Sequence, residues 1–319
     1  MRHPEYIYDG CVCMVEELGS VLRNGFETWK KNLIIALPFL FSLVLTLIAA
    51  LVILGAAILI IFGSLFASLL PAVTEPGEIP PEVIEQLWPQ ILQHLGVLAG
   101  AIIVMAILVL LINSFFTAGA IGMAKEATVQ GTTTLAAMNA YGRRKFLSLL
   151  GANVIVGLIA LAGVVFLIPG VLSLLPAVST SPPFSSGGGD AAAFAALGIG
   201  IFLLLMYLLL VSIIFAVTPY AVVLDDLRAV DGVKRGFQFF RAHKRDVFLL
   251  WLVVLVLAIA ASMLLGAIPS IGQMLSMAVS VAVIEPLSVI WWSRVYLSEK
   301  ASLSANLDSR IGVLRQQLE

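Results

Sequence analysis

The sequence predicts an all-α integral membrane protein with six transmembrane helices, and three observations lead to this prediction. Of the 319 residues, 61% are hydrophobic and only 12% are charged, which is too little polar surface for a soluble fold of this size. The uncharged stretches are long enough to cross a hydrocarbon layer of about 30 Å as helices. All eighteen lysines and arginines lie before the first span, in or beside the second and fourth connecting loops, or in the C-terminal tail. This distribution predicts that both termini are cytosolic.

The six expected spans cover residues 33–70, 96–123, 146–175, 191–224, 247–267 and 271–297. The first is longer than a bilayer requires, so it must tilt or bend, and Pro38 is the expected place for a bend. The loops 71–95 and 176–190 contain no lysine or arginine, so we expect them on the outer side. A short surface helix is expected in the first loop after Pro80 and Pro81.

The segments before the odd-numbered spans combine an apolar stripe with basic residues, which is typical of amphipathic helices that lie on a membrane surface. These segments are 14–31, 132–145 and 228–245. In the last, the stripe consists of Val230, Val233, Phe237 and Phe240. We expect the basic side chains of the three helices to contact anionic lipid headgroups of the inner leaflet. They are Lys30, Lys31, Arg143, Arg144, Lys145, Lys234, Arg235, Arg241, Lys244 and Arg245.

A small residue precedes an aromatic one in each of these helices, and the pattern indicates an internal repeat. The pairs are Gly25-Phe26, Ala140-Tyr141 and Gly236-Phe237. Each is followed by a basic cluster and two spans, so we expect three parallel hairpin units in a single membrane domain, residues 1–319. The units cover 14–123, 131–224 and 228–297, and 298–319 form a polar cytosolic tail with a short helix. The charge pattern alone would occur in any six-span protein, and the aligned aromatic residues favour the repeat.

Glu285 is the only ionisable side chain deep inside a predicted span, about 13 Å from its inner edge. A charge at that depth is unfavourable unless it is paired or hydrated. Pro286 follows it and frees a backbone carbonyl near Ala282. Polar side chains in the same half of the bilayer are expected to converge with Glu285 on a layer that binds an ion, a proton or a lipid headgroup; they are Thr117, Asn153 and Tyr220 at similar depth and Asn113 one turn deeper. The alternative is a protonated Glu285 whose hydrogen bond only holds helices together.

The sequence contains no HExxH, GxSxG or P-loop pattern, which disfavours an enzyme. Asp225 and Asp226 are interpreted as a stop at the membrane edge, because neighbours on a helix point about 100° apart. The acidic loop with His94, and the pair Cys11 and Cys13, lack the further ligands that a metal needs. We therefore expect no cofactor and no metal.

Two runs, FAVTPYAVVLDDLRAVDGVKRGFQFFRAHKRD and AGAIGMAKEATVQGTTTLAAMNAYGRRKF, carry a family resemblance. They resemble an uncharacterised group of prokaryotic six-span proteins, whose spans look like the membrane domain fused to some glycerophosphoryl diester phosphodiesterases. The likeness covers nearly the whole chain and implies the same topology. The catalytic domain of those enzymes has no counterpart here, so the resemblance implies no phosphodiesterase activity.

These observations favour a non-enzymatic membrane scaffold or lipid-associated module in the cytoplasmic membrane of a prokaryote. Its basic and aromatic helices would bind the anionic inner surface and could dock a protein partner. The alternative is an ion or small-solute transporter that uses Glu285. A lipid-modifying enzyme is a third interpretation, for which a second catalytic group is missing. No nucleic-acid partner is expected.

Overall fold

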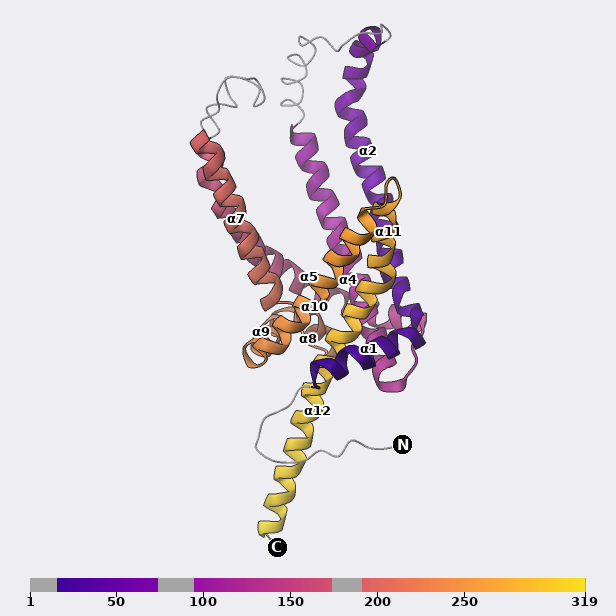
Figure 1. Cartoon of the computed structure of the whole chain (residues 1–319), viewed down its shortest axis with the longest axis vertical. Coiled ribbons are helices and arrows are strands. Elements are labelled where there is room, and N and C mark those ends of the chain that lie inside the picture. Colours follow the sequence, from indigo (N-terminus) through magenta and orange to yellow (C-terminus); the bar gives the residue numbers. More distant parts are fainter. Residues whose placement is uncertain (1–15, 74–94, 174–190, 319) are drawn as a thin grey trace.

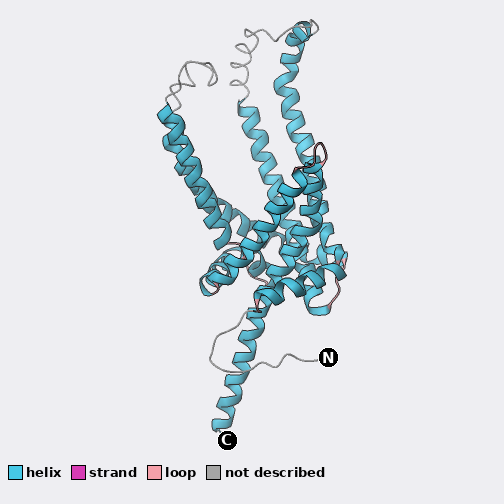
Figure 2. Ribbon diagram, viewed as in Figure 1, coloured by secondary structure: helices cyan, strands magenta, loops and turns pink. Residues whose placement is uncertain are grey.

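The computed structural model describes residues 16–73, 95–173 and 191–318. Within these residues every regular element is a helix (Figure 2). Six helical stretches are long and apolar enough to cross a membrane: Leu33–Ile60, Leu95–Gln130, Leu135–Ser173, Phe194–Leu224, Lys244–Gly266 and Gly272–Ser302. The prediction of an all-α, multi-pass membrane protein is confirmed. The surface helix expected after Pro81, both cysteines and His94 lie outside the described residues.

The chain begins with α1 (Leu18–Lys31), which leads through a 3₁₀ turn (Leu33–Ala36) into α2 (Leu37–Val73). Pro38 stands in the first turn of α2. The N–H groups of a first turn have no partner within the helix, so the N–H that proline lacks breaks no helical hydrogen bond there. The change of backbone geometry therefore falls beside the proline at which a bend is expected. The second membrane stretch is α4 (Leu95–Gln130), which ends at Gly131 with φ of 84°, a conformation that favours glycine.

One predicted boundary is wrong. The segment 132–145 is not a separate helix, because α5 (Leu135–Leu161) runs without a break through its basic cluster into the third span. Arginine and lysine are good helix formers and no proline stands between the two segments, so nothing ends the helix there. The N-terminus of α5 is capped by the Thr134 hydroxyl, which accepts a hydrogen bond from the N–H of Ala137. A 3₁₀ stretch, Ala162–Leu167, follows α5.

The fourth span consists of two helices, α7 (Ala191–Ile214) and α8 (Thr218–Leu224), rather than one. Pro219 is the cause, because it has no N–H for the carbonyl of Phe215, four residues earlier. That carbonyl instead accepts from the N–H of Thr218 at 3.0 Å. The turn reorients α8 before the two aspartates that follow it.

The last third of the chain contains α9 (Ala229–Ala242), α10 (Lys244–Gly266), α11 (Gly272–Val279) and α12 (Glu285–Leu318). A π-helical segment, Ser280–Ile284, joins α11 to α12 directly before Pro286. The N–H of Glu285 bonds the carbonyl of Ser280, five residues earlier, so the backbone is wider where the proline removes a donor. The prediction of a separate helix in the tail, residues 298–319, is also wrong, because α12 continues to Leu318.

The packed core lies at one end of the bundle. Its largest fully buried side chains come from α4, α5, α8, α9, α10 and α12, and include Ile121, Leu149, Val222, Phe239, Leu250 and Tyr296. Figure 1 shows α1 and α9 at this end, whereas α2, α4 and α7 extend away from it together. The extending parts expose many large apolar side chains, such as Leu51, Leu59, Ile103 and Phe202. Such surfaces suit lipid rather than water.

Glycines bring α1 and α9 into close contact with the core. A Cβ on Gly25 would lie 2.3 Å from Cδ1 of Trp291, and one on Gly236 would lie 2.5 Å from the hydroxyl of Thr218. The aromatic residues that follow these glycines, Phe26 and Phe237, are each 40% exposed. The middle pair differs: Tyr141 packs against Gly122, because its segment is part of α5 and is held against α4.

Candidate functional site

The two aspartates after α8 bind different elements. Asp225 caps α8, and Asp226 follows with φ of 60°, so the two carboxylates diverge. Asp226 forms ion pairs with Arg144 and Lys145 of α5. Asp225 accepts a hydrogen bond from the hydroxyl of Tyr296. These contacts tie the end of α8 to α5 on one side and to α12 on the other.

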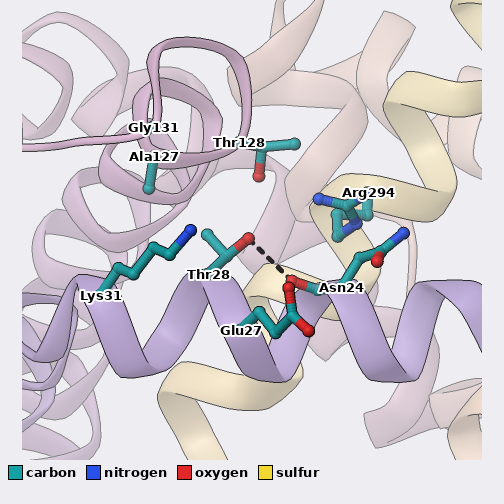
Figure 3. A pocket seen from close by; sticks show the side chains of 8 residues that line it. All are labelled: Asn24, Glu27, Thr28, Lys31, Ala127, Thr128, Gly131 and Arg294. Atoms are coloured by element: carbon teal, nitrogen blue, oxygen red, sulfur yellow. Dashed lines mark hydrogen bonds between the residues drawn. The ribbon is translucent and has the colours of Figure 1, made fainter. Parts of the chain in front are cut away.

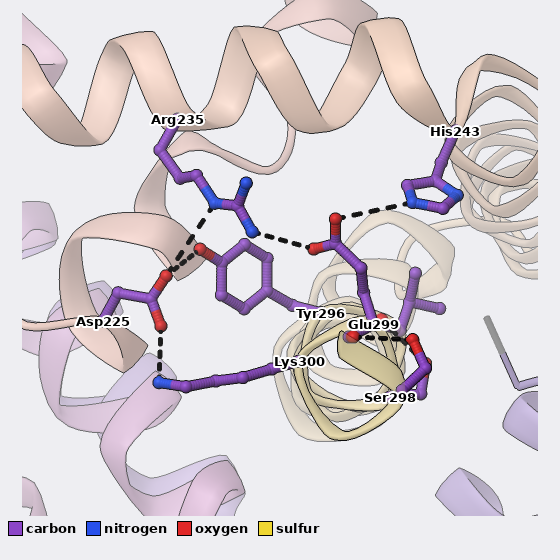
Figure 4. A network of polar contacts seen from close by, with 9 residues as sticks. Asp225, Arg235, His243, Tyr296, Ser298, Glu299 and Lys300 are labelled. Atoms are coloured by element: carbon purple, nitrogen blue, oxygen red, sulfur yellow. Dashed lines mark hydrogen bonds and ion pairs between the residues drawn. The ribbon is translucent and has the colours of Figure 1, made fainter. Parts of the chain in front are cut away.

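A network of charged side chains extends from Asp225 across α9 and α12 (Figure 4). Lys300 Nζ lies 2.9 Å from Asp225 Oδ1, and Arg235 Nε lies 4.0 Å from Asp225 Oδ2. The other end of the Arg235 guanidinium, Nη2, donates to Glu299 Oε2 at 3.2 Å. His243, at the junction of α9 and α10, places Nε2 at 3.5 Å from Glu299 Oε1. The residues of this charged network therefore connect four helices at the packed end of the bundle.

Hydrogen bonds and nearby positive charges favour the ionised forms of Asp225 and Asp226. Burial alone would raise the pKa of Asp225, but hydrogen bonds from Tyr296 and Lys300 and the nearby positive charges lower it below 3.8. Hydrogen bonds from Lys145 and Arg144 likewise lower the pKa of Asp226. Opposite charges are thus matched, and the arrangement holds helices in place. In the described part of the chain, no three His, Cys, Asp or Glu side chains are grouped closely enough to hold a metal.

A polar pocket of about 240 Å³ lies between α1, the end of α4 and α12 (Figure 3). It is lined by Asn24, Glu27, Thr28, Lys31, Ala127, Thr128, Gly131 and Arg294. Asn32, at the end of α1, holds the wall together: its amide donates to the carbonyls of Thr28 and Gly131 at 3.1 and 3.0 Å. Its Oδ1 accepts from the N–H of Thr133 at 3.2 Å.

The sequence of this chain matches a known protein family over residues 17–297, described as "Domain of unknown function (DUF7847)". The chain belongs to the DUF7847 family. The matched range starts just before α1 and ends inside α12, so it includes Asp225 and Arg235 of the charged network but stops short of Glu299. An "Uncharacterized protein" of Archaeoglobus fulgidus is 21% identical over 313 residues, which cover 92% of this chain and 99% of that relative. No solved structure matches the chain.

Within the DUF7847 range, the predicted polar layer is distributed over separate contacts. Asn113 Oδ1 accepts from Ser42 Oγ at 3.1 Å, and Asn153 Nδ2 donates to Ser114 Oγ at 3.1 Å. Tyr220 is buried and stacks on Trp292, with ring centroids 6.2 Å apart. Thr117 and Glu285 are half-buried, and neither side chain forms a hydrogen bond with another described residue. The convergence of these groups on Glu285 stays a prediction.

The expected headgroup contacts divide into two groups. Arg144, Lys145 and Arg235 form ion pairs with carboxylates of the protein itself. Lys145 is only 5% exposed, so its assignment to lipid is corrected, whereas lipid contact by Arg144 and Arg235 stays a prediction. The other seven are exposed and form no ion pair with the described residues; they are Lys30, Lys31, Arg143, Lys234, Arg241, Lys244 and Arg245. We call these seven residues the exposed cations.

Sequence reasoning did not identify Tyr296, Glu299 and Lys300 as parts of a site. They follow the tryptophan-rich end of the sixth span, where the sequence predicts only a membrane edge and a polar tail. One signal was present, because Glu299 and Lys300 stand three and four residues after Tyr296 on the same helix and so continue its face. Their partners on α8 and α9 are far away in sequence and are not indicated by it.

Proposed function

We propose that this protein is a non-enzymatic, multi-pass membrane module that associates with the anionic headgroups of the inner leaflet of a prokaryotic cytoplasmic membrane. One observation carries the proposal: the exposed cations lie on α1, α5, α9 and α10, and α1 and α9 lie at the packed end of the bundle (Figure 1). Phe26 on α1 and Phe237 on α9 expose equal shares of their surface beside them. The same face would be open to a protein partner.

The physical basis is the combination of charge and aromatic surface. Each lysine or arginine close to an anionic membrane surface contributes about 1 kcal/mol of attraction, so several together bind firmly. Exposed aromatic rings favour the interface between headgroups and acyl chains. In this proposal α1 and α9 are the amphipathic, interfacial helices of the first and third hairpin units. Both termini are cytosolic, as the distribution of lysine and arginine indicates.

The test compares the anionic lipid that co-purifies with three forms of the full chain: the wild type, a charge-neutralised variant and a variant that keeps the charge. The protein is reconstituted into bilayers of mixed neutral and anionic lipid, released gently and analysed by native mass spectrometry. Neutralising Arg241, Lys244 and Arg245 to glutamine should lower the share of co-purified anionic lipid, and the loss should shrink as salt is added. A matched control exchanges arginine and lysine at the same positions and keeps the charge. Equal lipid shares in all three forms would rule the proposal out.

A second candidate function is transport of an ion or small solute, and it is supported by the backbone around Glu285. The π-helical segment Ser280–Ile284 precedes this carboxyl group within a membrane-spanning stretch, and such segments are frequent at functional sites. If Glu285 carries a transported proton or cation, Glu285→Gln should abolish flux into proteoliposomes, followed with a pH-sensitive dye. It should leave lipid enrichment unchanged. Equal flux in the variant and the wild type removes this candidate.

A further inference from the structure

We infer that the polar pocket between α1, α4 and α12 binds a phosphodiester group. The inference rests on the proposed lipid association, because it assigns one phosphate-bearing ligand to a defined place on the protein. The pocket lies at the end of the bundle that carries α1, where headgroups would be in the proposed orientation (Figures 1 and 3).

The charges around the pocket leave one positive charge unbalanced. Glu27 is matched by Arg23, with Nε and Oε1 3.9 Å apart, and Arg294 is matched by Glu16, with Nη2 and Oε1 3.1 Å apart. Lys31 lines the pocket and has no ion pair among the described residues. A phosphodiester carries a single negative charge at neutral pH, so it matches this remaining charge.

Hydrogen-bond donors face the same space from two sides. In Figure 3 Lys31 and Arg294 lie at opposite sides of the pocket with Thr28 between them. Only Nη2 of the Arg294 guanidinium has a hydrogen-bond partner among the described residues, which leaves further N–H donors on that group. Asn24 donates one amide hydrogen to Glu16 at 2.9 Å and keeps the other. Charged donors of this kind form the stronger hydrogen bonds with phosphate oxygens.

The carbonyls at the end of α4 do not oppose an anion, although a helix C-terminus is negative. The carbonyl of Ala127 accepts from the N–H of Gly131 at 3.1 Å, and that of Gly131 accepts from Asn32. Both are therefore already bonded to donors, and the negative end of the helix dipole is partly offset at the pocket wall.

The size and position of the pocket favour a lipid as the source of the phosphate. Its volume of about 240 Å³ lies below the range of clefts that enclose drug-sized ligands, so it admits a phosphate and adjoining atoms but not a whole lipid. Leu33, two residues after Lys31, is 57% exposed and offers an apolar surface for the acyl chains. Free phosphate would satisfy the same donors, and the experiment separates the two sources.

The test uses the full chain in nanodiscs of phosphate-free galactolipid that contain a minor fraction of phosphatidylglycerol. Native mass spectrometry counts the phosphatidylglycerol retained after transfer to detergent, with and without inorganic phosphate as competitor. We expect one tightly retained lipid on the wild type. Lys31→Gln should lower its occupancy about tenfold, the effect of losing one charge-assisted hydrogen bond. Arg228→Gln, which removes an exposed charge at the start of α9 and outside the pocket, should leave the occupancy unchanged.

A second variant reduces the volume of the pocket without changing its charge. Thr128 is half-buried and lines the pocket, so Thr128→Leu should fill part of the space and also displace the lipid. Displacement of the lipid by inorganic phosphate would assign free phosphate as the ligand. Unchanged occupancy in Lys31→Gln and Thr128→Leu, or an equal loss in Lys31→Gln and Arg228→Gln, would overturn the inference.

The outcomes also separate this inference from the proposed function. If neutralising Arg241, Lys244 and Arg245 leaves the general enrichment of anionic lipid unchanged while Lys31→Gln removes the single bound lipid, the proposed function fails and the pocket stands. If the enrichment falls as proposed but no single retained lipid depends on Lys31, the membrane association stands and the pocket assignment fails.

Discussion

Gly25 of α1 lies directly against the indole ring of Trp291 on α12, and no side chain larger than hydrogen fits between them. The ring is also bonded to the same helix, because its Nε1 donates to the carbonyl of Leu22 at 3.2 Å. This contact sets the position of α1, and with it the position of Lys31 and the wall of the pocket.

The contact predicts that Gly25→Ala destabilises the protein. The added methyl group would overlap a ring that cannot swing aside, and overpacking of this kind typically costs about 1–3 kcal/mol. The thermal midpoint in detergent should fall. Gly19 is the matched control, because it lies on the same helix and a Cβ there would have no neighbour within 4 Å. Gly19→Ala should keep or raise the midpoint. Equal midpoints for both variants would show that the α1–α12 contact tolerates a methyl group.

Asp225→Asn should loosen the junction of α8, α9 and α12. The change keeps the shape of the side chain but removes the charge that Lys300 and Arg235 bind. We expect a loss of about 1–2 kcal/mol of unfolding free energy, since the network is partly exposed and screened by solvent. Denaturant unfolding measures it. Asp231→Asn removes an exposed carboxylate of α9 that forms no ion pair with the described residues, and should have a smaller effect.

The stability of the protein should fall in acid. The pKa of Asp225 and that of Asp226 are both below 3.8 in the folded state, so each carboxylate binds its proton more weakly when folded than when unfolded. Their contribution is therefore complete above about pH 4 and is lost as the pH falls through the folded-state pKa values. A series of thermal midpoints against pH would reveal it. In Asp225→Asn the decline should be shallower, and a decline of the same steepness would contradict this origin.

Asp226 and Lys145 should respond unequally to substitution. Asp226→Asn leaves the buried ammonium of Lys145 without its anion, whereas Lys145→Met leaves an exposed carboxylate that still has Arg144. The first variant should therefore be the less stable one. Combining the two substitutions should restore part of the loss, which a double-mutant cycle measures. Equal losses, with no recovery in the double variant, would show that the ion pair is not what holds Lys145.

The chain of apolar stretches was enough to predict six membrane-crossing helices, because spans are governed by local composition and length. Two local changes were indicated as well, because the bend expected at Pro38 and the carbonyl freed by Pro286 each stand beside a change of backbone geometry. The division of the fourth span at Pro219 was not predicted. The error at 132–145 arose because basic residues mark a membrane edge but do not end a helix. The sequence offered no breaker after Lys145, and α5 continues.

The charged network was not predictable in the same way. Asp226 and Arg144 are 82 residues apart, and Asp225 and Tyr296 are 71 apart, so their pairing depends on how the helices pack. For this reason the sequence did not indicate that three of the ten cations expected at lipid headgroups, Arg144, Lys145 and Arg235, form ion pairs with carboxylates of the protein. For the same reason the pocket beside Lys31 had no sequence signature, since its walls come from α1, α4 and α12.

The length of α12 has a mechanical consequence. The helix runs unbroken from Glu285 to Leu318, about 50 Å. Its first half is held in the bundle by buried side chains such as Ile290 and by the contacts of Tyr296, Glu299 and Lys300 with α8 and α9. About 27 Å of helix continues from Lys300 to Leu318, so a small change in the tilt of the held part displaces Leu318 more than it displaces Lys300.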